Sequence, residues 1–411
     1  MSLNNTPASE RLHIGFFGLM NVGKSSLINA VTAQQLSLVS DIPGTTTDPV
    51  HKTMELLPLG PVVIIDTAGI DDTGKLGEMR AERARKVLEQ TDIAVLVTEA
   101  GRELQPSEKE LISLFNEKNI SYIIAYNKDD PEGRQITEAG QTDSFTPDAE
   151  HGICVSALTG KNINALKEKL GEFSKKWEEK KHVIVTDLLA PYDMTILVIP
   201  IDESAPKGRL ILPQQQVMRE LLDAHMSFIA CQPEEIPQVL ADLQKKPALV
   251  ITDSQAFGKV SKLVPEEITL TSFSILFARY KGSLKTLVAG AAELSKLADG
   301  DKVLISEGCT HHRQCNDIGT VKMPGWIEGF AGVKPEFGFT SGHGFPDDLK
   351  EYKLIVHCGG CMLNEQEMKS RMKAAKAAGV PMVNYGIAIA HMHGILKRSL
   401  EPFPDVLEMI G

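Results

Sequence analysis

Short apolar runs alternate with amphipathic stretches along most of the chain, which is the pattern of an α/β fold built on largely parallel sheets. The apolar runs predict strands, and the amphipathic stretches between them predict the connecting helices. Strands are predicted over residues 11–17, 62–65, 121–126, 194–201, 248–252, 270–276, 302–306, 352–356 and 381–385. Helices are predicted over residues 26–31, 214–224, 236–245, 282–297 and 366–378.

The length of the chain, 411 residues, exceeds what one hydrophobic core normally supports and indicates roughly three units. A charged stretch over residues 175–182 ends the helix that begins at Asn162 and marks a natural boundary. We therefore expect α/β units over residues 1–180, 183–265 and 266–411. The middle unit carries no convergent chemical residues, so we expect it to associate with a second copy as a homodimer. The long connection over residues 310–348 is expected to be a functional loop.

Composition narrows the class of protein. The formal net charge is −11, which argues against a general nucleic-acid binder because such proteins carry a basic patch. No stretch is long and apolar enough to span a bilayer, so no membrane partner is expected. Residues 1–10 lack the basic and apolar regions of a signal peptide. The expected location is the cytoplasm.

The first predicted strand runs into Gly-Leu-Met-Asn-Val-Gly-Lys-Ser over residues 18–25, which matches the phosphate-binding pattern GxxxxGK[ST]. Glycines such as Gly23 allow successive backbone N–H groups to surround a phosphate at a helix N-terminus. Lys24 adds a positive charge, and Ser25 can bind Mg²⁺. The required strand and helix flank the motif, so a chance match is a poor explanation.

Later segments follow in the order of the motifs that bind and hydrolyse a nucleoside triphosphate. Asp66 ends a predicted strand and can hold Mg²⁺ through water, and the Gly69 N–H can meet the γ-phosphate. Residues 43–48 form a polar segment suited to ordering around that phosphate and the metal. The carboxylate of Asp130, in Asn-Lys-Asp-Asp over residues 127–130, can accept from both the ring N–H and the amine of guanine. Ser156 and the residues after it would close the base pocket. The nucleotide is therefore expected to be GTP.

These five segments resemble the G1 to G5 motifs of translation-factor-class GTPases over about residues 10–178. More narrowly, Asn21 and the Gly44-Thr45-Thr46 run are similar to the potassium-activated GTPases of the MnmE and Era group. That resemblance implies that Thr46 binds Mg²⁺ and that Asn21 helps to hold a K⁺ ion in place of an arginine finger. The residues expected to bind nucleotide and its ions are Asn21, Gly23, Lys24, Ser25, Ser26, Thr45, Thr46, Asp66, Gly69, Asn127, Lys128, Asp130, Ser156 and Ala157.

The expected catalytic residues are Lys24, Thr46, Gly69 and Glu78. Glu78 stands where the MnmE type has an acidic residue that acts through water, although an exposed helical glutamate is an equally simple interpretation. Ile70 stands where Ras-like enzymes carry their water-orienting glutamine. Because an isoleucine cannot polarise water, slow intrinsic hydrolysis is expected.

Cysteines provide the second chemical signal. Cys358 and Cys361 lie in His-Cys-Gly-Gly-Cys at a predicted strand-to-helix turn, and Cys309 follows another predicted strand. Since ligands gather at the carboxyl ends of parallel strands, these thiols should converge on one centre, with His311 and His357 beside them. From the spacing, a structural zinc, an iron-sulfur cluster and a redox Cys-x-x-Cys all stay open. Cys154 and Cys231 are expected to be buried thiols, and Cys315 a loop residue or a spare ligand.

A GTPase joined to this cysteine pattern resembles the HydF family, the GTPases that mature FeFe-hydrogenase, over nearly the whole chain. The resemblance implies a GTPase domain, a dimerisation domain and an α/β iron-sulfur cluster domain. It implies that Cys309, Cys358 and Cys361 hold a 4Fe-4S cluster whose fourth position is open or filled by a histidine, such as His311 or His357, or by an exchangeable group. It also implies a scaffold that receives a diiron precursor bearing CO and cyanide from radical-SAM maturation enzymes and passes it to apo FeFe-hydrogenase.

The competing hypothesis is an RNA-associated GTPase of the Era or MnmE kind with a structural zinc. The acidic charge and the three converging thiols favour the scaffold.

Overall fold

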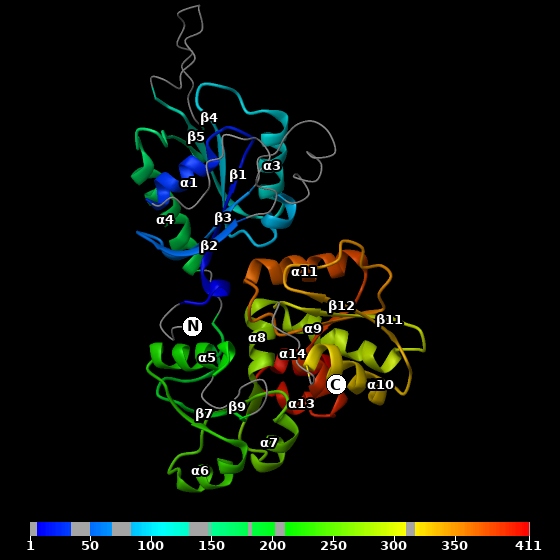
Figure 1. Ribbon diagram of the computed structural model, residues 1–411. Helices are drawn as coiled ribbons and strands as arrows, with labels where there is room; N and C mark the ends of the chain where they lie inside the picture. The colour runs from blue at the N-terminus through cyan, green and yellow to red at the C-terminus, as the bar shows by residue number, and fades with distance from the viewer. Residues whose placement is uncertain are drawn as a thin grey trace, which may run out of the picture. The chain divides into compact units, whose positions relative to one another are not determined.

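The computed structural model describes residues 6–33, 50–67, 84–130, 148, 150–179, 183–201, 210–309 and 317–410. It divides into two compact units, Met1–Lys181 and His182–Gly411 (Figure 1). None of the described helices is both long and apolar enough to cross a lipid bilayer.

The first unit is built on a six-stranded sheet in the order β2-β3-β1-β4-β5-β6, in which only β2 runs antiparallel to its neighbour. Its strands are β1 (Leu12–Phe17), β2 (Val50–Leu56), β3 (Gly60–Asp66), β4 (Ile93–Glu99), β5 (Ser121–Asn127) and β6 (Gly152–Cys154). Helices α1 (Lys24–Thr32), α3 (Pro106–Glu117) and α4 (Ile163–Glu179) belong to this unit, and residues 84–88 are also helical.

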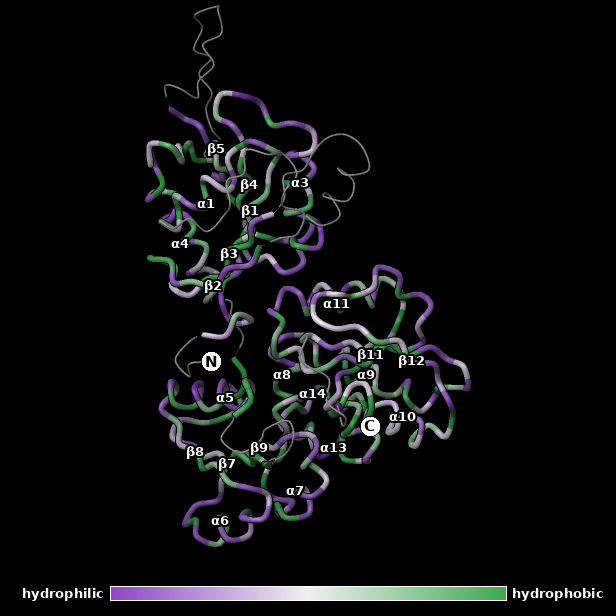
Figure 2. Tube along the Cα trace, in the orientation of Figure 1, coloured by the Kyte–Doolittle hydropathy of each residue, from purple (hydrophilic) through white to green (hydrophobic). Residues whose placement is uncertain are grey.

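Both faces of this first sheet are covered. Leu27 of α1 and Leu166 of α4 pack in the cluster on one face, and Phe115 of α3 packs in the cluster on the other. The central residues of β4 and β5 and most residues of β1 are therefore buried and hydrophobic (Figure 2). Because parallel strands buried on two faces read as continuous apolar runs, β1 and β5 could be predicted, and the structure confirms them. Strand β4 was not among the predicted strands.

The second unit contains two four-stranded sheets, both fully parallel. The first has the order β10-β9-β7-β8, with β7 (Met194–Val198), β8 (Ser227–Cys231), β9 (Leu249–Thr252) and β10 (Leu270–Ser272). The second has the order β12-β11-β13-β14, with β11 (Lys302–Glu307), β12 (Glu336–Ser341), β13 (Leu354–His357) and β14 (Met382–Asn384).

Helices surround and join the two sheets of the second unit. They are α5 (Leu212–Asp223), α6 (Ile236–Asp242), α7 (Phe257–Leu263), α8 (Phe273–Lys281), α9 (Leu284–Ala291), α10 (Met323–Ala331), α11 (Glu365–Ala378), α12 (Tyr385–Met392), α13 (Leu396–Ser399) and α14 (Pro404–Leu407). Leu221 of α5, Leu276 of α8 and Ile355 of β13 belong to one hydrophobic cluster. The two sheets therefore share a core, with α8 as part of it.

Three expectations about the second unit are wrong. The predicted strand over residues 270–276 ends at Ser272, whose hydroxyl oxygen accepts from the Ile275 N–H (3.4 Å) and caps α8. Because β10 pairs with β9, the middle sheet extends past residue 265, and residues 266–411 are not a separate fold. The connection over residues 310–348 is not one long loop either, since it contains α10 and β12.

Candidate functional site

The phosphate-binding motif forms the expected turn between β1 and α1. Gly18 has φ +147° and Gly23 has φ +86°, where side chains are strained. A Cβ atom at Gly18 would overlap the Val97 carbonyl oxygen, and one at Gly23 would overlap the Asn127 side chain. The glycines are therefore required for the loop to lie this close to β4 and β5.

Lys24 and Ser25 open α1 and face the centre of this loop. The buried Lys24 Nζ donates to the carbonyl oxygens of Gly18 (3.1 Å) and Leu19 (2.9 Å), so its charge lies across the loop. The Ser25 hydroxyl donates to Asp66 Oδ2 (3.2 Å). Since β1 and β3 are parallel neighbours, the two expected Mg²⁺-binding residues meet at one edge of the sheet.

Asn127 connects the phosphate loop to the base pocket. Its amide nitrogen donates to the Val22 carbonyl oxygen (3.0 Å), and its amide oxygen accepts from the Ala157 N–H (3.0 Å). The Ser156 hydroxyl donates to Asp130 Oδ2 (2.8 Å), which orients the carboxylate expected to read guanine. Residues from three predicted motifs are thus brought together.

Lys128, Asn21 and Ser26 are the remaining described residues that were expected to bind the nucleotide or its ions. Lys128 pairs with Glu99 at the end of β4, a residue that the motif analysis missed because it stands in no motif. Asn21 is exposed in the loop with φ +60°, and Ser26 follows in the first turn of α1. Several expected residues lie outside the described residues: Thr45, Thr46, Gly69, Ile70 and Glu78.

The cysteines lie where parallel strand ends meet, as expected. Ser306 of β11 is in register with His357 of β13, and the Cys358 N–H donates to the Ser306 carbonyl oxygen (2.9 Å). Cys309 follows β11 two residues after its last residue, Glu307. The ends of β11 and β13 therefore place Cys309 and Cys358 at the same edge of the second sheet.

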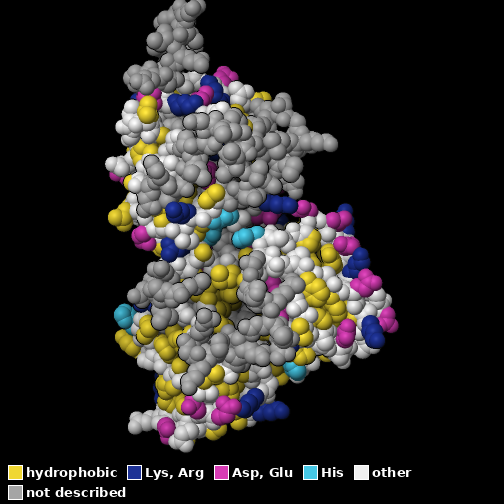
Figure 3. Space-filling view, in the orientation of Figure 1, with side chains coloured by type: hydrophobic (Ala, Val, Ile, Leu, Met, Phe, Trp, Pro, Cys, Tyr) yellow, Lys and Arg dark blue, Asp and Glu magenta, His cyan; other side chains and the backbone are white. Residues whose placement is uncertain are grey.

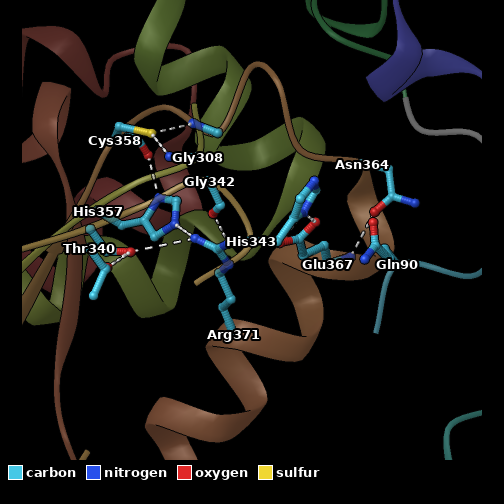
Figure 4. A network of polar contacts seen from close by, with 12 residues as sticks. Gln90, Gly308, Thr340, Gly342, His343, His357, Cys358, Asn364, Glu367 and Arg371 are labelled. Carbon is cyan, nitrogen blue, oxygen red and sulfur yellow. Dashed lines mark hydrogen bonds and ion pairs between the residues drawn. The ribbon is translucent and has the colours of Figure 1, made fainter. Parts of the chain in front are cut away.

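Cys358 Sγ accepts two backbone hydrogen bonds, from the Gly308 N–H (3.0 Å) and the Gly360 N–H (3.4 Å) (Figure 4). Such N–H donors stabilise a metal-bound thiolate, so the surroundings of this sulfur fit an iron-sulfur cluster or a zinc ion. Burial raises the pKa of the Cys358 thiol to about 11, and metal binding there would release its proton.

The described residues do not contain an assembled ligand set. No three of their His, Cys, Asp or Glu side chains form a group that could hold a metal ion. His311, His312 and Cys315 lie in the stretch 310–316, outside the described residues.

His357 has another role than the expected one as a metal ligand. Its Nε2 lies 2.9 Å from Arg371 Nη1, and its Nδ1 lies 2.7 Å from the Cys358 carbonyl oxygen. A guanidinium only donates, so Nε2 is the acceptor and Nδ1–H donates to Cys358. Burial, and then the Arg371 charge, lower the pKa of His357 to about 4. With both nitrogens engaged, the buried neutral ring orients the Cys358 peptide in this structure.

Arg371 is the centre of a buried network that no sequence motif predicts (Figure 4). Its Nη2 donates to Glu367 Oε1 (2.7 Å) and to the Gly342 carbonyl oxygen (2.6 Å). Glu367 Oε2 in turn lies 2.9 Å from His343 Nδ1, and this hydrogen bond is the main cause that raises the pKa of His343. One guanidinium therefore links α11 to the segments that follow β12 and end β13.

Three family models match the chain. The model described as "50S ribosome-binding GTPase" matches residues 13–128. "Hydrogen maturase F dimerization domain" matches residues 184–282, and "Hydrogen maturase F tetramerization domain" matches residues 285–402. The chain belongs to the hydrogen maturase F family. Its N-terminal unit is a GTPase domain of P-loop type, and its hydrogen maturase F domains make up the second unit.

Curated relatives of this hydrogen maturase F chain are GTPases. GTPase Der from Wolinella succinogenes is 35% identical over 169 residues, which are 40% of this chain and 36% of that protein. The tRNA modification GTPase MnmE from Lactococcus lactis is 35% identical over 164 residues, 40% of this chain and 34% of that protein. The chain therefore spans about a third of the length of the curated relatives it matches.

A crystal structure of Era with MgGDPNP and a segment of 16S ribosomal RNA is 24% identical and covers 39% of this chain and 56% of its own. Its TM-score is 0.32, too low to bear on function.

Proposed function

We propose that the chain is a GTP-hydrolysing scaffold for FeFe-hydrogenase maturation. It binds a 4Fe-4S cluster through Cys309, Cys358 and Cys361, receives a diiron precursor bearing CO and cyanide from radical-SAM enzymes, and delivers it to apo FeFe-hydrogenase. The observation that carries the proposal concerns the Cys358 sulfur. This atom accepts hydrogen bonds from two backbone N–H groups, and it lies in a hydrogen maturase F domain where the carboxyl ends of β11 and β13 meet.

The nucleotide site supplies the binding groups that GTP and Mg²⁺ need. The backbone of residues 18–25 and the Lys24 ammonium hold the phosphates, while Ser25 and Asp66 hold Mg²⁺. Asp130, oriented by Ser156, accepts from the guanine edge. We propose that the switch segments, residues 40–48 and 66–80, report the phosphate state to partner proteins.

The cluster would supply a redox-active iron centre with one position for an exchangeable ligand. The residues of this chain hold the thiolates and shape their surroundings. The Gly308 and Gly360 N–H groups donate to Cys358 Sγ, and the His357 ring holds the Cys358 carbonyl oxygen by a hydrogen bond.

Substitution of the cysteines separates ligands from supporting residues. We expect Cys309→Ser, Cys358→Ser and Cys361→Ser each to lose most iron after anaerobic reconstitution, because each removes a charged ligand. His357→Ala should keep most iron, since it removes hydrogen bonds to the Cys358 carbonyl oxygen and to Arg371 but no thiolate ligand. The matched control is Cys231→Ser, a buried thiol of the other sheet, which should bind iron like the wild type. Iron loss in His357→Ala as complete as in the cysteine variants would refute this assignment.

The monovalent ion gives a second test. We propose that K⁺ completes the GTPase site next to Asn21, so GTP hydrolysis should be slow, Mg²⁺-dependent and faster in KCl than in NaCl. Asn21→Ala should remove the difference between the salts, because the exposed amide in the loop is the proposed ligand. Phosphate release in the two salts at equal ionic strength measures it, and equal wild-type rates would exclude a role for K⁺.

The hydrogen maturase F domains indicate self-association. We propose a homodimer through the middle sheet, in which β8 is an edge strand that pairs on one side with β7. Apolar side chains also gather on the visible face of the second unit (Figure 3), and Leu222 of α5 is 56% exposed. Sedimentation of the full chain measures its mass, and a monomer at micromolar concentration would rule the dimer out.

A further inference from the structure

The last residue of α8, Lys281, has a buried side chain, with 2% of its surface exposed. Lysine is almost never fully buried without partners because its ammonium group loses hydration. The position of this lysine therefore requires an explanation in terms of what its charge contacts.

The ammonium group of Lys281 donates to the turn that carries Cys361. Its Nζ lies 2.8 Å from the Leu363 carbonyl oxygen, 3.2 Å from that of Cys361 and 3.4 Å from that of Gly360. These three acceptors match the three donors of an ammonium group. One buried charge thus holds the backbone on both sides of the second cysteine.

Two of these carbonyl groups belong to the peptide groups on either side of Cys361. The Cys361 N–H shares a peptide group with the Gly360 carbonyl, and the Met362 N–H shares one with the Cys361 carbonyl. A cation at the carbonyl end of a peptide strengthens the hydrogen bond donated at its N–H end.

The turn also leaves little room to rearrange. Gly360 has φ +63°, and a Cβ atom there would lie 2.7 Å from Met368 Sδ. With α11 on one side and Lys281 on the other, the peptide groups around Cys361 are fixed before any metal binds.

We propose that Lys281 is a positioning residue for metal binding at Cys361. It orients and polarises the two peptide groups on either side of Cys361 through their carbonyl oxygens, and it places a positive charge beside an anionic metal-thiolate centre. For the iron-sulfur cluster this inference rests on the proposed function, but the effect applies to any thiophilic divalent metal at this site.

Cobalt(II) provides a probe that does not depend on cluster assembly, because its thiolate absorption reports binding directly. In anaerobic titrations of the metal-free full-length chain, we expect Lys281→Met to weaken cobalt(II) binding at least tenfold. Lys281→Gln, which keeps donors for the carbonyl oxygens but removes the charge, should also weaken it, and Lys281→Arg should recover most of the affinity. The matched control is Lys285→Met, at an exposed lysine of α9 that pairs with Asp405, and it should bind like the wild type.

The reconstituted cluster gives an independent readout. Loss of a nearby positive charge disfavours the reduced, more negative cluster, so the midpoint potential of Lys281→Gln should fall. A tenfold shift of a one-electron equilibrium corresponds to about 59 mV.

The outcomes separate the inference from the proposed function. Cobalt(II) affinities of Lys281→Met and Lys281→Gln within twofold of the wild type would overturn the role of Lys281. If Lys281→Met does not fold, Lys281→Gln decides alone. If the Lys281 variants bind cobalt(II) more weakly but the wild-type chain forms no iron-sulfur cluster, the positioning role of Lys281 is supported and the proposed function is refuted. A wild-type chain that takes up no cobalt(II) would refute both.

Discussion

Replacing Lys24 by alanine should abolish GTP binding and leave the metal content of the chain unchanged. The Lys24 ammonium lies across the phosphate loop on the Gly18 and Leu19 carbonyl oxygens, where the phosphates of a nucleotide would meet it. Hydrogen bonds to charged groups contribute about 1.5–3 kcal/mol each. Loss of two such bonds from the Lys24 ammonium to phosphate oxygens therefore corresponds to roughly a thousandfold weaker GTP binding. Calorimetric titration with a non-hydrolysable GTP analogue measures this change.

The metal should be unaffected because the cysteines belong to the other compact unit. Lys109→Ala, at an exposed lysine of α3, is the control for loss of a lysine in the GTPase domain. GTP affinity in Lys24→Ala equal to that of Lys109→Ala would show that the loop binds no phosphate. Loss of both iron and GTP binding in Lys24→Ala would contradict the expectation that the two sites are independent.

Replacing Arg371 by methionine should destabilise the second unit by about 3–5 kcal/mol, the usual effect of removing one partner from a buried ion pair. Glu367, 5% exposed, would keep a buried carboxylate without its guanidinium, and the Gly342 carbonyl oxygen would lose its donor. His357 would lose the donor to its Nε2 as well. Scanning calorimetry should show a lower transition temperature for this unit.

The same helix offers a matched control. Lys369 pairs with Glu365 at the same four-residue spacing, but its side chain is 53% exposed, so Lys369→Met should change stability by less than about 0.5 kcal/mol. The double variant Glu367→Leu/Arg371→Met should recover part of the loss, because it leaves no unpaired buried charge. Equal transition temperatures for Arg371→Met and Lys369→Met would show that the buried network does not stabilise the fold.

Much of the fold could be predicted because parallel strands buried on both faces appear as continuous apolar runs. The edge strand β12 could not, since its exposed and half-buried residues include Gly338 between two phenylalanines and give no clear run. The N-terminal end of α10 was obscured by Pro324 and Gly325, which usually mark loops. The boundary at residue 265 separated β10 from its sheet because the pairing of β10 with β9 is a tertiary contact, which a local sequence pattern does not reveal.

The residues of the candidate sites likewise divide into those that sequence motifs predict and those that only the structure reveals. Motifs located the phosphate loop, the guanine pocket and the cysteine turn because each depends on residues close together in sequence. The role of His357 depends on Arg371, fourteen residues later, which looks like part of an ordinary helical surface pair with Glu367. Lys281 likewise looks like a basic residue at a helix C-terminus, and only its burial distinguishes it.

The most direct test of the proposed scaffold is the metal content and visible spectrum of the full-length chain purified without oxygen. We expect a brown protein with broad thiolate-to-iron absorption, and with iron and acid-labile sulfide in equal amounts that disappear together in Cys358→Ser. A colourless protein with stoichiometric zinc would contradict the cluster. That result would favour an RNA-associated GTPase with a structural zinc at the same cysteines.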